Sequence, residues 1–120
     1  ETLMTGYDVL KKVLNLLGYV DSDDKVTHDS GLYNRSFYII NQILADLNQD
    51  EIKGMNDEIK IPQKSAEALP YGVAMLLALV SGDSNKNHLF AEVYNSKRSA
   101  ALCQKEIIDD KMPNVALGEI

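Results

Sequence analysis

The sequence predicts an all-α fold of four to five helices, arranged as an antiparallel helical bundle with a long C-terminal helix. Three observations predict it. Apolar residues recur at steps of three and four along the chain, capping and turn residues separate the segments, and no convincing strand run lies between them. The 120 residues are expected to form a single helical domain, with a helical core over 1–110 and a flexible C-terminal tail over 111–120.

The first helix is predicted over Gly6–Leu17. Thr5 and Asp8 stand three residues apart, which is the spacing of the two partners in a capping box. Gly18 follows the segment and is suited to the left-handed conformation that ends a helix. The apolar stripe of this helix contains Tyr7, Leu10, Leu14 and Leu17.

The second helix is predicted over Ser30–Gln49, and a long connector between helices 2 and 3 follows it over Asp50–Lys64. In this connector Ile59 and Ile61 alternate with charged neighbours, which favours either a short extended piece or a surface loop held by two isoleucines. Connectors of this length are often functional. The apolar stripe of the second helix contains Tyr33, Phe37, Ile40, Leu44 and Leu47.

The third helix is predicted over Ser65–Val80, with Ser65 as its N-cap. Pro70 inside it predicts either a separate first turn or a kink, because an interior proline removes a helical hydrogen bond. From Tyr71 onward the segment is apolar on nearly all sides, so we expect it to be buried, in part against another subunit.

The fourth helix is predicted over Asn85–Asp110, which gives it a length on the order of 40 Å. Gly82 is expected to stop the third helix, and Asp83 or Ser84 to cap the fourth, so that the two helices pack as an antiparallel hairpin. Pro113 is expected to end the helical run and to leave a short C-terminal tail.

Composition limits the classes of function. Acidic residues outnumber basic residues 18 to 12, and the net charge of −6 disfavours sequence-independent binding of nucleic acid. A single cysteine, Cys103, excludes an internal disulfide. The longest uncharged stretch, Ala68–Gly82, is shorter than a bilayer span requires and is predicted to be a buried helix. The chain begins at Glu1 and not at a methionine, so we expect a trimmed or partial chain. No signal-peptide pattern precedes the first predicted helix.

The sequence predicts no catalytic residue, no cofactor and no metal site. Asp21 and Asp23 match the first and third positions of a calcium loop, but Val26 replaces its glycine and Leu32 replaces its final glutamate. His28 and His88 lie too far apart to make the usual zinc spacing. Cys103 has no histidine close in sequence that would serve as its base, so inert packing is the preferred interpretation.

The main basic cluster lies in the predicted fourth helix and comprises Lys97, Arg98 and Lys105. Two interpretations stay open: contact with nucleic acid, and a face that forms salt bridges or contacts another subunit. Glu92 and Glu106 flank the cluster and weaken its positive charge, which favours the second interpretation.

The third and fourth helices carry a more specific pattern. It resembles the small helical head–tail connector proteins of tailed bacteriophages, also called head-completion or DNA-packaging adaptor proteins. The resemblance covers roughly 59–102 and lies in packing motifs. The matching residues are the Ile61-Pro62 step, Leu69–Ala74, Leu76–Ala78, the Gly82-Asp83 turn, Phe90 and Tyr94-Asn95.

The resemblance implies a non-enzymatic structural protein of the virion, made in the host bacterial cytoplasm. It would form a homo-oligomeric ring at the head–tail junction, between the portal and the tail or stopper proteins, through which DNA passes without tight binding. No membrane partner is expected. Small residues would allow close helix packing at Tyr71, Gly72, Ala74 and Ala78, and subunit contacts are expected at Glu92, Lys97 and Arg98. The connector and the tail are candidate partner contacts that would order on assembly.

The main alternative is a small helical regulatory module that binds a protein or a nucleic acid through its second helix or through the face that carries Lys97. Salt-dependent binding to duplex DNA would favour this alternative. An enzyme is a third and more distant hypothesis, and it would require a site around Cys103 and His88.

Overall fold

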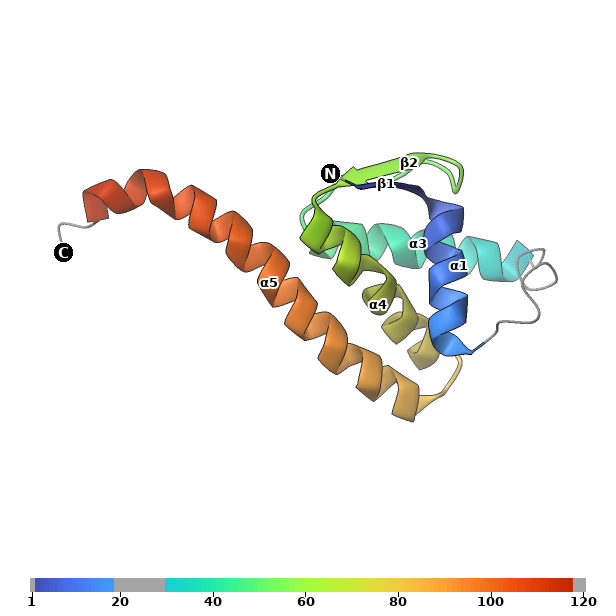
Figure 1. Cartoon of the computed structure of the whole chain (residues 1–120). Helices are drawn as coiled ribbons and strands as arrows, with labels where there is room; N and C mark the ends of the chain where they lie inside the picture. The colour runs from blue at the N-terminus through green and yellow to red at the C-terminus, as the bar shows by residue number, and fades with distance from the viewer. Residues whose placement is uncertain (1, 19–29, 118–120) are drawn as a thin grey trace.

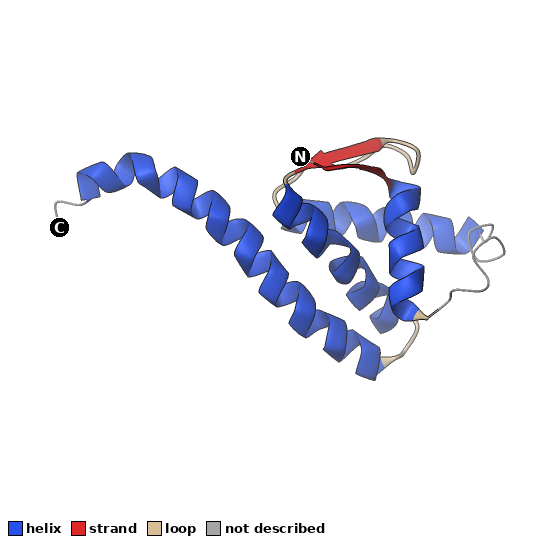
Figure 2. Ribbon diagram, in the orientation of Figure 1, coloured by secondary structure: helices blue, strands red, loops and turns tan. Residues whose placement is uncertain are grey.

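The computed structural model describes the backbone of residues 2–18 and 30–117 and the side chains of residues 3–18 and 31–103. The described chain is mostly helical, which confirms the predicted all-α class, and a small two-stranded sheet is added to it (Figures 1 and 2). Its elements are β1 (Thr2–Thr5), α1 (Gly6–Leu17), α3 (Ser30–Asp46), β2 (Glu58–Ile61), α4 (Gln63–Val80) and α5 (Ser84–Leu117).

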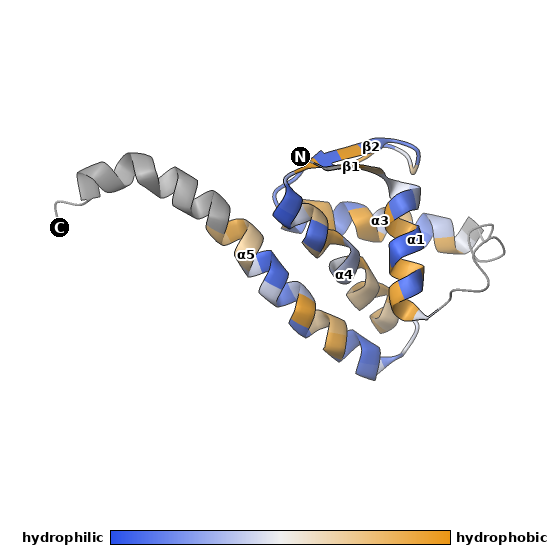
Figure 3. Ribbon diagram, in the orientation of Figure 1, coloured by the Kyte–Doolittle hydropathy of each residue, from blue (hydrophilic) through white to orange (hydrophobic). Residues whose placement is uncertain are grey.

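Helix α4 lies at the centre of the fold and contacts α1, α3 and α5. It forms an antiparallel hairpin with α5, while α3 crosses behind α1 and α4 (Figure 1). Apolar and polar residues alternate in bands along α1, as an amphipathic helix requires (Figure 3). The apolar residues of all four helices join one core, whose largest fully buried side chains include Leu10, Leu14, Ile40, Leu44 and Leu69.

The start and the end of α1 are as predicted. The amide of Asp8 donates to the hydroxyl of Thr5 at 3.2 Å, and the amide of Thr5 donates to the Asp8 carboxylate at 3.1 Å, so the capping box is complete. Gly18 ends the helix with φ 91°, a conformation that a residue without a Cβ adopts at little cost.

The sequence did not predict β1. It pairs antiparallel with β2, and the register places Thr2 opposite Ile61 and Met4 opposite Ile59. Met4, Ile59 and Ile61 are buried, whereas Leu3 is 59% exposed, so the ribbon covers the core with one face. Four residues show too little alternation to predict a strand, and the partner lies more than 50 positions away. Of the two interpretations of Ile59 and Ile61, the extended piece is confirmed.

Helix α3 ends at Asp46, three residues earlier than predicted. Asn48 adopts a left-handed conformation with φ 62°, and its amide donates to the carbonyl of Ala45 at 3.0 Å. The amide of Gln49 donates to the carbonyl of Leu44 at 2.8 Å. Together these bonds form a Schellman motif with asparagine in the place that glycine usually takes.

Side chains hold the connector that follows α3 in place. The amide group of Asn41 accepts from the Ile52 N–H at 2.8 Å and donates to the Ile52 carbonyl at 3.0 Å, as a neighbouring strand would. The carboxylate of Asp57 accepts from the amides of Lys53 and Gly54 at 2.8 and 3.1 Å. The connector is therefore fastened to the fold through its backbone.

Helix α4 begins at Gln63, two residues earlier than predicted, and Ser65 is not its N-cap. Pro62 occupies that position and makes no side-chain capping bond, while Ser65 is buried inside the helix. The cap prediction is wrong because the fixed φ of proline suits a helix start, which the Ile61-Pro62 step supplies. Pro70 lies buried within the continuous helix, so Ala66 to Leu69 do not form a separate turn.

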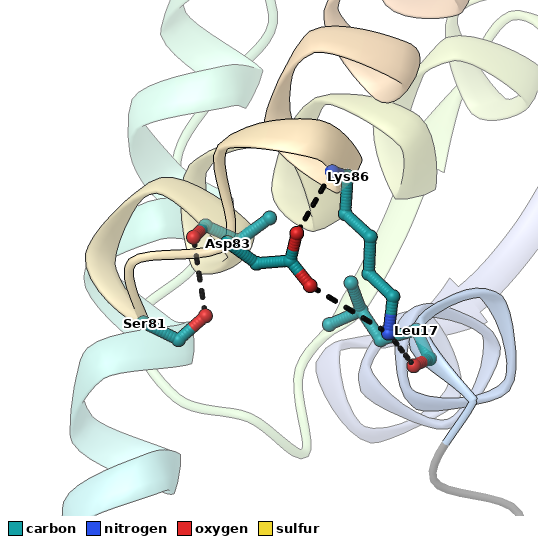
Figure 4. Close-up of polar contacts among 5 residues, drawn as sticks. Leu17, Ser81, Asp83 and Lys86 are labelled. Carbon is teal, nitrogen blue, oxygen red and sulfur yellow. Dashed lines mark hydrogen bonds and ion pairs between the residues drawn. The ribbon is translucent and has the colours of Figure 1, made fainter.

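The turn between α4 and α5 follows the prediction. Gly82 is left-handed with φ 85°, and the carboxylate of Asp83 accepts from the Lys86 amide at 3.0 Å, which caps α5 (Figure 4). The ammonium of Lys86 donates to the carbonyl of Leu17 at 2.8 Å. The turn is thus fastened to the C-terminal end of α1, where the helix dipole favours a cation.

Helix α5 extends to Leu117, so the predicted end at Asp110 is wrong and Pro113 lies inside the helix. A proline removes only one backbone hydrogen bond, and here it stands in the last turns of a helix of 34 residues. Its length is about 51 Å at the rise of an α-helix. The first half packs on α4, and the second half leaves the globule, so that the molecule extends over 59 × 31 × 19 Å (Figure 1).

Candidate functional site

Gly72 on α4 lies against side chains of both α3 and α5. A Cβ atom at this position would stand 2.8 Å from Cε1 of Tyr94 and 2.9 Å from Cγ2 of Ile43. The missing side chain therefore permits the close approach of three helices. Ala74 and Ala78 lie on the same helix and are also buried inside the chain. The small residues singled out in the sequence thus serve the internal packing of the fold.

A cluster of polar groups, formed by Asp46, Tyr94 and Arg98, joins α3 to α5. Oδ2 of Asp46 accepts from the Tyr94 hydroxyl at 2.6 Å and from Nε of Arg98 at 2.7 Å. Burial raises the pKa of Tyr94 well above its ordinary range, and the hydrogen bond to Asp46 raises it further. Arg98 was predicted as a subunit contact, and in the structure it forms an ion pair within its own chain.

A groove of about 410 Å³ runs between α1, α4 and α5. Lys97 lies in it with its ammonium 5.4 Å from the centre of the Tyr71 ring, a cation–π geometry. Lys12 enters the same groove from α1. The remaining lining residues are Asn15, Leu16, Ala66, Glu67 and Pro70.

Sequence reasoning found two residues of this groove, Tyr71 and Lys97, and missed its α1 wall. Lys12 and Asn15 belong to the polar face of α1, and their spacing does not predict which other helix packs beside that face. The contact between α1 and α4 is a tertiary one, so only the structure brings Lys12 and Lys97 to the same groove.

The remaining predicted contact, Glu92, is exposed on α5 and lies 3.6 Å from Nε2 of His88. Further along the hairpin, three large apolar side chains are more than half exposed: Leu79, Val80 and Leu89. They surround the turn between α4 and α5.

The structure does not bring the candidate chemical groups together. Cys103 is exposed, and His88 precedes it by 15 residues on the same helix, so about 22 Å of helix separates them. No group of three metal-ligating side chains occurs within the described residues. The acidic residues Asp21, Asp23 and Asp24 and the histidine His28 lie outside the described part, as does the side chain of Lys105.

Comparison with protein-family models, with curated proteins and with solved structures finds no match to this chain. Among the helices in the described ranges, none has the length and the apolar character that crossing a bilayer requires.

Proposed function

We propose that this chain is a structural subunit of a tailed bacteriophage, which assembles into a ring between the portal and the tail and acts without catalysis. The observation that carries the proposal is the course of α5. About half of this helix lies beyond the globule, where no other described element runs beside it (Figure 1). Most of the stability of a helix in a protein comes from tertiary packing, so a partner chain is the natural source of stabilisation for this unpacked half.

The exposed apolar residues of the hairpin turn support a second contact surface. Leu79, Val80 and Leu89 are each 55–58% exposed and lie at the end of the molecule opposite the projecting half of α5. Contact surfaces at two separate ends suit a subunit that bridges two neighbours. A ring between portal and tail requires that arrangement.

The charge of the chain is compatible with a channel through which DNA slides. The net charge is −6, and the Arg98 guanidinium is already paired with Asp46. This pairing leaves less free positive charge in the cluster around Lys97 than the sequence suggests, which weakens the alternative of a nucleic-acid-binding module.

The test is assembly. The concentrated protein, alone and mixed with purified portal rings of the same phage, is examined by native mass spectrometry and by electron microscopy. We expect rings with a central channel or additional density on the portal. A protein that stays monomeric and does not bind the portal at any concentration would refute the proposal. Salt-dependent binding to duplex DNA would favour the regulatory module.

A further inference from the structure

The groove between α1, α4 and α5 has an apolar floor and two cationic walls. Leu16, Ala66 and Pro70 supply apolar surface, and Lys12 and Lys97 reach the groove from different helices. Neither lysine forms an ion pair with any carboxylate whose side chain the structure describes. Glu67, the one acid in the lining, already accepts a hydrogen bond from Gln63 at 3.2 Å. The groove therefore suits a segment that offers apolar side chains and carboxylates together.

The chain itself contains such a segment. The run 106–110 reads Glu-Ile-Ile-Asp-Asp, which places two isoleucines among three carboxylates with no basic residue between them. Its backbone belongs to the half of α5 that leaves the globule (Figure 1). The segment and the groove are complementary in both charge and hydrophobicity.

A chain cannot fill its own groove with this segment while α5 stays helical. Lys97 lines the groove from the same helix, and Glu106 follows it by nine residues, which is about 14 Å along the axis. The segment is therefore available only to another molecule. A contact between one patch and a different patch of the next copy is heterologous, and such contacts close into rings when the rotation between copies allows it.

We propose that the 106–110 segment of one copy docks in the groove between α1, α4 and α5 of the next copy and that this contact links the subunits of the ring. The proposal rests on the proposed function for the ring itself. It adds the residues that form the subunit contact, namely Lys12 and Lys97 on one side and Glu106, Asp109 and Asp110 on the other.

Charge reversal in the full-length chain tests the contact. The groove variant is Lys12→Glu with Lys97→Glu, and the segment variant is Asp109→Lys with Asp110→Lys. Sedimentation velocity over a concentration series should show self-association at least about tenfold weaker for each variant, because like charges would then face each other. The chain that carries all four substitutions should recover self-association. An equimolar mixture of the two double variants should also recover association, because the segment of each variant then meets a groove of opposite charge on the other.

The matched control is Lys11→Glu with Lys60→Glu, which changes the net charge equally at exposed positions outside the groove. Circular dichroism of each variant verifies that it is folded. A groove variant or a segment variant that self-associates as strongly as the wild-type chain would overturn the docking proposal, as would a folded fourfold variant without recovery. Attachment to portal rings is measured separately, so a chain that self-associates through the groove without binding portal would refute the proposed function and leave the docking intact.

Discussion

The hydroxyl of Tyr94 on α5 donates a 2.6 Å hydrogen bond to the carboxylate of Asp46 at the end of α3, 48 positions earlier in the chain. The same carboxylate oxygen accepts from Arg98 at 2.7 Å. These two bonds fix the first half of α5 against α3.

Replacing Tyr94 with phenylalanine should lower the free energy of unfolding by about 1 kcal/mol. A hydrogen bond to a charged acceptor contributes about 1.5–3 kcal/mol, and the partial exposure of Asp46 reduces that value. Arg98 keeps the carboxylate paired in the variant. Urea unfolding followed by circular dichroism measures the change, and Tyr38→Phe, on a side chain that is 72% exposed, is the control. An equal loss in both variants would contradict this role of the hydroxyl.

The same contact predicts a loss of stability at alkaline pH. Burial, with the Asp46 bond as a further cause, raises the pKa of Tyr94 in the folded state above the value of about 10 that an unfolded tyrosine has. The contribution of Tyr94 is therefore complete below about pH 10 and is lost as pH rises toward the folded-state pKa. Above about pH 10 the wild-type chain should lose stability more steeply than Tyr94→Phe. If the free energies of unfolding of the two proteins fell equally with pH, this role of Tyr94 would be refuted.

Gly72→Ala should destabilise the fold by about 1–3 kcal/mol, although alanine favours helices more than glycine does. The added Cβ would stand 2.8 Å from the Tyr94 ring and 2.9 Å from Ile43, so these two buried side chains must shift. Thermal and urea unfolding measure the loss. Gly54→Ala is the control, because no atom lies within 4 Å of a Cβ there, and a similar loss in the control would show that close packing is not the cause.

Local signals in the sequence predicted the structure well where neighbouring residues decide it. The Thr5–Asp8 capping box and the left-handed Gly18 and Gly82 all lie within one helical turn of the feature that they terminate. Where contacts are distant, prediction failed. The pairing of β1 with β2 depends on partners more than 50 positions apart, and no spacing rule connects them.

The candidate site shows the same division. Tyr71 and Lys97 stood out in the sequence, whereas Lys12 did not, because only the packing of α1 on α4 brings it to the groove. Arg98 stood out as a subunit contact, yet its carboxylate partner Asp46 lies 52 positions away and could not be identified from local spacing. Groups that act through tertiary contacts have no signature within a single helix.

Lys86→Met should lower the free energy of unfolding by about 1 kcal/mol or less. Its ammonium donates to the carbonyl of Leu17 at 2.8 Å and interacts favourably with the C-terminal end of α1, but it is 43% exposed and is screened by solvent (Figure 4). About 1 M salt, where the screening length is about 3 Å, should reduce the difference from wild type. Lys60→Met, at an exposed position of β2, is the control. A loss that is independent of salt would indicate packing rather than charge.

Ser36→Ala should stabilise the protein, by about 1 kcal/mol. Ser36 is fully buried on α3, and its hydroxyl has no hydrogen-bond partner within the described residues. An unpaired buried polar group costs about 1–3 kcal/mol, and alanine removes that cost while keeping most of the packing. Ser81→Ala is the control, because the Ser81 hydroxyl donates to the Ala78 carbonyl at 3.1 Å. Removing this paired hydroxyl should leave the free energy of unfolding unchanged or lower it slightly. A loss of stability in Ser36→Ala, measured by urea unfolding, would mean that the hydroxyl is satisfied in solution.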